Sequence, residues 1–105
     1  GHPVRGASWE AMVIENIVAA MPSYRCSYYR TSAGAEVDLV LEKGGRRFVI
    51  ECKASTAPAP GSGFWNALED IKPEKTWIAA PVDEAYSIKK SVIVAPLAAI
   101  IEDLK

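Results

Sequence analysis

Apolar residues recur with the period of an α-helix in three segments of the chain. Segment 8–20 is predicted as the first helix, because Trp9, Val13 and Ile17 recur along one helical face. Ser8 can cap its start, since a serine side chain accepts a hydrogen bond from the first free backbone amides. The same period predicts two shorter helices, at 64–72 and 97–105.

Shorter apolar runs, bounded by glycine, proline or serine, are typical of β-strands. They lie at 25–31, 35–42, 47–54, 75–81 and 91–96. With the helices they give the order α-β-β-β-α-β, followed by one more strand and one more helix. The first three strands are predicted to form an antiparallel meander, and a helical crossover makes the fourth strand parallel. The predicted fold class is α/β, with one mixed sheet flanked by helices.

The composition fits one globular domain over residues 1–105, with 50% hydrophobic and 24% charged residues. Twelve basic and thirteen acidic residues give a formal net charge of −1, which disfavours nucleic-acid binding by bulk charge. Cys26 and Cys52 are predicted to be buried thiols in a reducing compartment. No membrane span or signal peptide is recognisable, so we expect a cytoplasmic domain. Residues 1–2 are interpreted as a tag remnant before an excised domain.

The second and third predicted strands carry charges inside apolar runs. Two glycines at 44–45 suit a two-residue type I′ hairpin, in which both turn residues need positive φ. This register places Asp38 opposite Glu51, and Glu36 opposite Lys53. Strict alternation predicts one apolar face, made of Val37, Leu39, Leu41, Phe48, Ile50 and Cys52. The other face holds Glu36, Asp38, Val40, Val49, Glu51 and Lys53.

Two carboxylates directly opposite each other in a sheet repel. A divalent cation would make the arrangement favourable, and Mg²⁺ is usually held by one or two carboxylates together with water and phosphate. Lys53 beside Asp38 and Glu51 could orient a water or balance charge on a phosphate. The alternative is a solvated polar face, on which Glu36 and Lys53 form a simple cross-strand ion pair.

Glu10 is the other candidate carboxylate. Val13, Ile14 and Ile17 follow it at helical spacing, so Glu10 lies on or beside the core-facing side of the first helix. A carboxylate there needs a partner, because burying an unpaired charge is costly. The alternative is that Glu10 only stabilises the positive end of the helix dipole.

This ordered set of residues resembles the PD-(D/E)XK nuclease superfamily, which has the restriction-endonuclease-like fold. Its motif is carried by Glu10, Asp38 and the pair Glu51-x-Lys53 in the order α-β-β-β-α-β. The segments "GASWEAMVIENIV", "YYRTSAGAEVDLVLE" and "FVIECKAS" resemble the C-terminal domain of unknown function of prokaryotic AAA-type P-loop ATPases. Val37 replaces the usual proline before the aspartate, and Cys52 replaces the usual aliphatic residue inside E-x-K.

The resemblance implies a metal-dependent phosphodiesterase that acts on DNA or another nucleic acid. Asp38 and Glu51 would ligate Mg²⁺ or Mn²⁺, Lys53 would assist the attacking water, and Glu10 would complete the site. The alternative is a non-catalytic accessory domain that binds nucleic acid or a protein partner. The chain has no G-x-x-x-x-G-K-[ST] motif, so the P-loop ATPase would lie upstream in the full-length protein.

Three arginines are candidates for contacts with nucleic acid. Arg30 belongs to an aromatic and basic strip at 24–30 that could stack bases and touch phosphate. Arg46 and Arg47 lie at the predicted hairpin tip and could contact a phosphate backbone. The alternative is that these arginines occupy ordinary solvated strand and turn positions. A separate interpretation of the whole domain is that it dimerises through an exposed edge of its sheet.

Overall fold

The computed structural model describes residues 5–105, so the interpretation of residues 1–2 lies outside the described part. The helices are α1 (Arg5–Ala20), α2 (Ser62–Ile71) and α3 (Leu97–Leu104), with a short 3-10 turn at Lys89–Ser91. The strands are β1 (Arg25–Arg30), β2 (Glu36–Lys43), β3 (Arg46–Cys52), β4 (Lys75–Ala79), β5 (Tyr86–Ser87) and β6 (Ile93–Ala95). The predicted order of elements is confirmed, and β5 is the one strand that the hydrophobic pattern missed.

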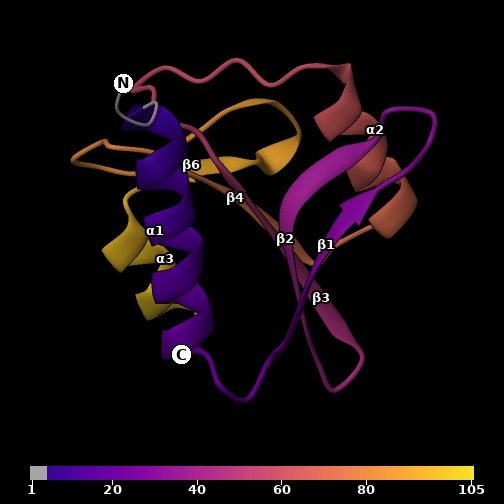
Figure 1. Cartoon of the computed structure of the whole chain (residues 1–105), viewed down its shortest axis with the longest axis horizontal. Coiled ribbons are helices and arrows are strands. Elements are labelled where there is room, and N and C mark those ends of the chain that lie inside the picture. Colours follow the sequence, from indigo (N-terminus) through magenta and orange to yellow (C-terminus); the bar gives the residue numbers. More distant parts are fainter. Residues whose placement is uncertain (1–4) are drawn as a thin grey trace.

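All of these strands form a single mixed sheet, in the order β1-β2-β3-β4-β6-β5. β1, β2 and β3 form the predicted antiparallel meander, and β4 lies parallel to β3 after the α2 crossover. Figure 1 shows α1 and α3 side by side over one face of the sheet and α2 over the other. The predicted fold class, a mixed sheet flanked by helices, is confirmed.

Each face of the sheet has its own hydrophobic core. The face under α1 and α3 is built around Val13, Ile17, Leu41 and Ile50, all fully buried, and Trp77, which is 1% exposed. The face under α2 buries a second cluster that includes Val49, Ala67, Ile78 and Val94. A sheet covered on both faces explains why residues 48–50 of β3 and 77–79 of β4 are continuous apolar runs. No helix within residues 5–105 is long and apolar enough to cross a membrane.

The hairpin between β2 and β3 has the predicted register. Lys43 pairs with Arg46, and the pairing continues to Leu39 with Ile50. Gly44 and Gly45 have φ values of 58° and 81°, the positive values that a type I′ turn requires. A two-residue turn fixes which residues face each other, so the position of Glu51 along the hairpin follows from the turn.

A β-bulge interrupts β2 beside Asp38. Ser27 of β1 pairs with Val40, whereas Tyr29 pairs with Val37. Between these pairs, two residues of β2 lie opposite one residue of β1, which is the arrangement that defines a bulge. The extra residue breaks the strict alternation of side chains along β2 at the position of Asp38.

The bulge corrects one predicted face of the hairpin. Alternation predicts Val37 on the same face as Leu39 and Leu41, but this prediction is wrong. Val37 packs with Val40 in the cluster under α2, while Leu39 and Leu41 pack under α1 and α3. Because one additional residue reverses the alternation, Val37 and Leu39 end on opposite faces of the sheet.

The predicted start of the first helix is also wrong. Ser8 lies inside α1, whose described part already begins at Arg5, so it is not the N-cap residue. Serine is only a modestly poor helix former, and a local capping signal therefore does not prevent the helix from continuing through it. The two cysteines are free thiols, of which Cys52 is buried and Cys26 is half-buried.

Candidate functional site

Asp38 and Glu51 meet between β2 and β3, where the ladder of backbone pairs ends. The Asp38 N–H donates a hydrogen bond of 3.0 Å to Glu51 Oε1. In the other direction, the Cys52 N–H donates one of 2.9 Å to Asp38 Oδ2. Each carboxylate therefore accepts a hydrogen bond from the backbone of the opposite strand, beyond the last pair at Leu39 and Ile50. These contacts hold the two candidate ligands side by side.

Glu51 is buried to an unusual degree for a carboxyl group, with 8% of the residue exposed. Burial, and then the charge of Asp38, raise the pKa of Glu51 to about 8. The hydrogen bond from the Asp38 amide and the charge of Lys53 act in the opposite direction but do not cancel this effect. At neutral pH the fold thus favours the protonated form of Glu51.

Lys53 lies directly beyond the carboxylate pair. Its Nζ is 3.8 Å from Glu51 Oε2, and its side chain is 44% exposed whereas that of Glu51 is 10% exposed. The Lys53 N–H donates to the carbonyl of Ala79 at 2.9 Å, which fixes its backbone against the end of β4. The ammonium group consequently stands between the buried carboxyl group and solvent.

The alternative interpretation, a cross-strand ion pair between Glu36 and Lys53, does not match the structure. Glu36 instead pairs with Arg30, with 3.8 Å between Oε1 and Nε, and Lys53 pairs with Glu51. The reason is that regular β2–β3 pairing stops at Leu39, after which the Lys53 backbone bonds to β4. Lys53 therefore belongs to the carboxylate pair and not to a solvated cross-strand pair.

Glu10 reaches the same neighbourhood from α1, where it is half-buried. Burial and, in decreasing order, the charges of Asp38, Glu51 and Glu10 together raise the pKa of the Cys52 thiol to about 12. Cys52 stays a protonated, unreactive thiol as a result. Within the described residues Glu10 makes no ion pair, so it contributes negative charge to the surroundings of Cys52 without contacting a cation of the chain.

The candidate metal ligands are Asp38 and Glu51. Within residues 5–105, no three His, Cys, Asp or Glu side chains are grouped so that they could hold a metal ion. Two hard carboxylate oxygens still fit Mg²⁺ or Mn²⁺, because such cations keep several waters and take further oxygens from substrate phosphates. Burial is the main cause of the raised pKa of Glu51, and the adjacent charge of Asp38, which the nearby Lys53 does not fully offset, adds to it.

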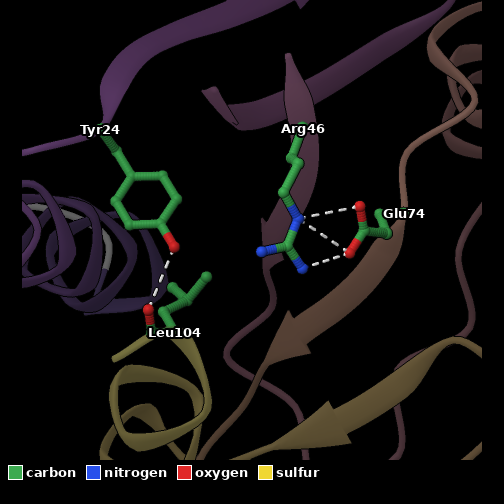
Figure 2. A network of polar contacts seen from close by, with 4 residues as sticks. All are labelled: Tyr24, Arg46, Glu74 and Leu104. Carbon is green, nitrogen blue, oxygen red and sulfur yellow. Dashed lines mark hydrogen bonds and ion pairs between the residues drawn. The ribbon is translucent and has the colours of Figure 1, made fainter. Parts of the chain in front are cut away.

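The three predicted nucleic-acid contacts do not form one group. Arg30 pairs with Glu36 at the end of β1 that is remote from the hairpin tip. At the tip, Arg46 Nε lies 3.1 Å from both carboxylate oxygens of Glu74, as Figure 2 shows. Arg47 is exposed and lies across from Glu42 in the hairpin. Arg46 therefore has the closest contacts with a carboxylate in this set, and Arg30 has a longer one.

Sequence reasoning missed two features that position the site. One is the bulge beside Asp38, and the other is the backbone amide of Cys52 that binds the Asp38 carboxylate. Neither has a signal in the local pattern, because Val37 and Val40 are equally apolar and every residue except proline has a backbone N–H.

The fold and the site define a class: a mixed α/β domain with a buried carboxylate pair and a lysine at the end of a central hairpin. Residues 5–100 match the model of the family described as "Domain of unknown function (DUF4143)". The chain belongs to this family. No solved structure matches it.

Two mycobacterial proteins are similar to the chain. They are the "Uncharacterized protein Mb2031c" of Mycobacterium bovis and the "Uncharacterized protein Rv2008c" of Mycobacterium tuberculosis. Each is 30% identical over 95 residues, which cover 90% of this chain and 22% of the relative. The chain thus spans about a fifth of the length of these relatives.

Proposed function

We propose that this domain is a metal-dependent phosphodiesterase of the PD-(D/E)XK type that acts on nucleic acid. The observation that carries the proposal is the contact between Asp38 and the buried Glu51, with Lys53 Nζ 3.8 Å from Glu51. A carboxyl group with a strongly raised pKa next to a second carboxylate is more common at functional sites than in ordinary hairpins. The order of these residues along the chain, with Glu10 before them, supports the same proposal.

The chain's own residues have distinct roles in this proposal. Asp38 and Glu51 would hold Mg²⁺ or Mn²⁺, which when bound supplies Lewis-acid stabilisation of charge on a phosphate oxygen. Lys53 is partly exposed and would orient a water or balance charge on the phosphate. The backbone amides of Asp38 and Cys52 keep the two carboxylates in place before a substrate arrives. Glu10 adds negative charge from the α1 side.

We further propose that the domain is the C-terminal part of a prokaryotic AAA-type P-loop ATPase. The chain has no phosphate-binding P-loop motif of its own, and it spans 22% of each mycobacterial relative. The remaining length of a relative is sufficient for an ATPase domain upstream. The ATPase would then be the partner that this domain meets in the full-length protein.

A cleavage assay tests the assignment of the site. With Mg²⁺ or Mn²⁺, plasmid and branched DNA should be cut by the wild type, and Asp38→Asn should lower the rate about 100-fold, the loss typical of removing one stabilising group. Glu36→Gln is the matched control, because Glu36 is an exposed carboxylate on the same strand. Activity that survives unchanged in Asp38→Asn would show that these carboxylates do not carry the reaction.

A second candidate is a non-catalytic accessory domain that binds nucleic acid or a protein for the ATPase. It is favoured by the protonated form of Glu51 at neutral pH and by the lack of a third ligand among the described residues. It predicts no cleavage with either cation, together with nucleic-acid binding that is the same in wild type and Asp38→Asn. Cleavage that depends on Asp38 would exclude it.

A further inference from the structure

A continuous surface lies at the end of the sheet opposite to the carboxylate pair. It consists of a cavity of about 600 Å³ and a neighbouring cavity of about 540 Å³, which share Glu74 and Lys75. Lys75 and Ile93 begin β4 and β6, whereas Glu51 and Lys53 lie at the carboxyl end of the parallel strand β3. In Figure 1 the β2–β3 turn lies at the bottom of the view, and α3 also ends in the lower half.

The charge of this surface differs from that of the whole chain. Three acidic side chains line the two cavities, at Glu69, Glu74 and Asp103. Six of the twelve basic residues line them, at Lys43, Arg46, Lys72, Lys75, Lys90 and Lys105. These six residues and the space between them are called the basic surface below. It carries a surplus of three positive charges on a chain whose formal net charge is −1.

Part of this positive charge is not neutralised within the domain. Arg46 is held by Glu74, and Lys75 Nζ lies 3.4 Å from Asp103 Oδ2. Lys43, Lys72 and Lys90 make no ion pair with any residue that the structure describes. These three lysines come from a hairpin tip, a helix end and a 3-10 turn; Lys43 lines one cavity, and Lys72 and Lys90 line the other. An anion long enough to span both cavities would meet three ammonium groups without displacing an internal carboxylate.

The floor of the larger cavity is a row of aromatic rings. Phe48 lies between Tyr24 and Trp77, with 6.1 Å from its ring centroid to each of theirs. Cationic groups lie over all three rings, at 5.3, 5.3 and 5.1 Å from the centroids for Lys43, Arg46 and Lys75. Figure 2 shows Tyr24 and Arg46 on facing sides of this region, each fixed by its own hydrogen bond.

Two of these rings are not available for stacking on a nucleobase. Phe48 is 6% exposed and Trp77 is 1% exposed, and stacking would require an open ring face. The Trp77 indole N–H is buried and has no acceptor among the described residues. Tyr24 and Trp65 also line the cavities and are half-buried, but Lys43 lies over the Tyr24 ring and Lys89 over the Trp65 ring. The surface therefore offers mainly cationic groups, which match phosphate oxygens.

We propose that the basic surface binds the phosphate backbone of nucleic acid, without reading its sequence. This inference takes the identity of the polyanion from the proposed function. An extended polyanion fits better than a single phosphate, because the unpaired lysines are divided between the two cavities. Lys43 is five residues from Asp38 along β2, a separation of roughly 17 Å at about 3.3 Å per residue. That length corresponds to about five nucleotides of a duplex strand, at 3.4 Å each.

Fluorescence anisotropy of labelled oligonucleotides in EDTA tests this inference. EDTA removes divalent cations, so binding is measured without the carboxylate site. We expect the 105-residue chain to bind a 20-base-pair duplex, with affinity that falls steeply as salt rises. The triple variant K43Q/K72Q/K90Q should bind at least about tenfold more weakly at 50 mM salt, with a salt slope shallower by about two to three. The ion pairs of Arg46 and Lys75 remain in this variant, so the fold is preserved.

A control variant locates the effect. Arg25→Gln removes one exposed positive charge that lines neither cavity, and it should leave the affinity unchanged. Unchanged binding by the triple variant, or equal weakening by Arg25→Gln alone, would overturn the assignment to the basic surface.

Competitors distinguish a nucleic-acid backbone from other anions. Inorganic phosphate that displaces the duplex at stoichiometric concentration would indicate a small-phosphate site and overturn the inference, as would equally tight binding of poly-glutamate. A wild type that binds neither duplex nor single-stranded DNA nor RNA also overturns it. The proposed function is decided separately, by cleavage with Mn²⁺ and its dependence on Asp38.

Discussion

The side chain of Glu51 is buried beside a second carboxylate, and for both reasons its ionisation is unfavourable in the folded chain. Lys53 compensates only in part, because its ammonium group is 3.8 Å away and 44% of its side chain is exposed. Stability alone would favour an apolar residue at this position of β3, whose neighbours Ile50 and Cys52 are buried. A carboxyl group that the fold places at such a cost is a strong candidate for function.

This burial predicts how stability depends on pH. Folding raises the pKa of Glu51 from 4.5 to about 8, so between these values the folded chain binds more protons than the unfolded chain. The contribution of Glu51 to stability is complete below about pH 4.5 and is lost as pH rises through about 8. We expect the wild type to lose about 3 kcal/mol more than Glu51→Gln between pH 5 and pH 8, at 1.36 kcal/mol per pKa unit.

Urea unfolding of both proteins across this pH range measures the difference. Comparison with Glu51→Gln cancels the titration of other groups, because glutamine keeps the shape of the glutamate side chain but does not ionise. Parallel pH profiles for the two proteins would contradict the account of Glu51.

At the level of elements, the hairpin shows which features a sequence can predict. Its register follows from the two glycines at 44–45 and is confirmed. The bulge depends on how β1 pairs with β2, a contact between distant residues that leaves no mark on local hydrophobicity. The sequence therefore predicted the candidate carboxylates on the correct strands. It did not predict the bulge in β2 beside Asp38 or the ion pair between Glu36 and Arg30.

The packing of α2 against the β1–β2 turn gives a prediction at the same scale. A Cβ atom added at Gly63 would lie 2.4 Å from the carbonyl oxygen of Gly34, a backbone atom that cannot move away alone. Gly63→Ala should destabilise the domain by about 1–3 kcal/mol, the usual range for overpacking. Gly61→Ala is the control, because a Cβ there meets no atom within 4 Å and its φ is −87°. Equal stability of the two variants in thermal unfolding would contradict this close approach.

Across the whole molecule, charge is separated between the two ends of the sheet. The carboxylate pair lies at the carboxyl end of β3, and the basic surface lies where β4 and β6 begin. The net charge of −1 conceals this separation, because acidic residues in the rest of the chain outweigh the positive surplus of the basic surface. The sequence could not reveal the basic surface, since its members are spread from Lys43 to Lys105 and meet only in the folded chain. A polyanion bound to the basic surface could extend along the hairpin toward Asp38.

The proposed function requires that Asp38 and Glu51 together form a divalent cation site, which remains a proposal. Calorimetric titration of Mn²⁺ into the wild type at pH 8, where Glu51 is more readily ionised, tests it most directly. Asp38→Asn and Glu51→Gln remove one candidate ligand each, and Glu36→Gln removes a carboxylate outside the pair. We expect the wild type and Glu36→Gln to bind one Mn²⁺ each, and we expect Asp38→Asn and Glu51→Gln to bind none. Absence of binding to the wild type, or binding that persists in Asp38→Asn, would contradict it.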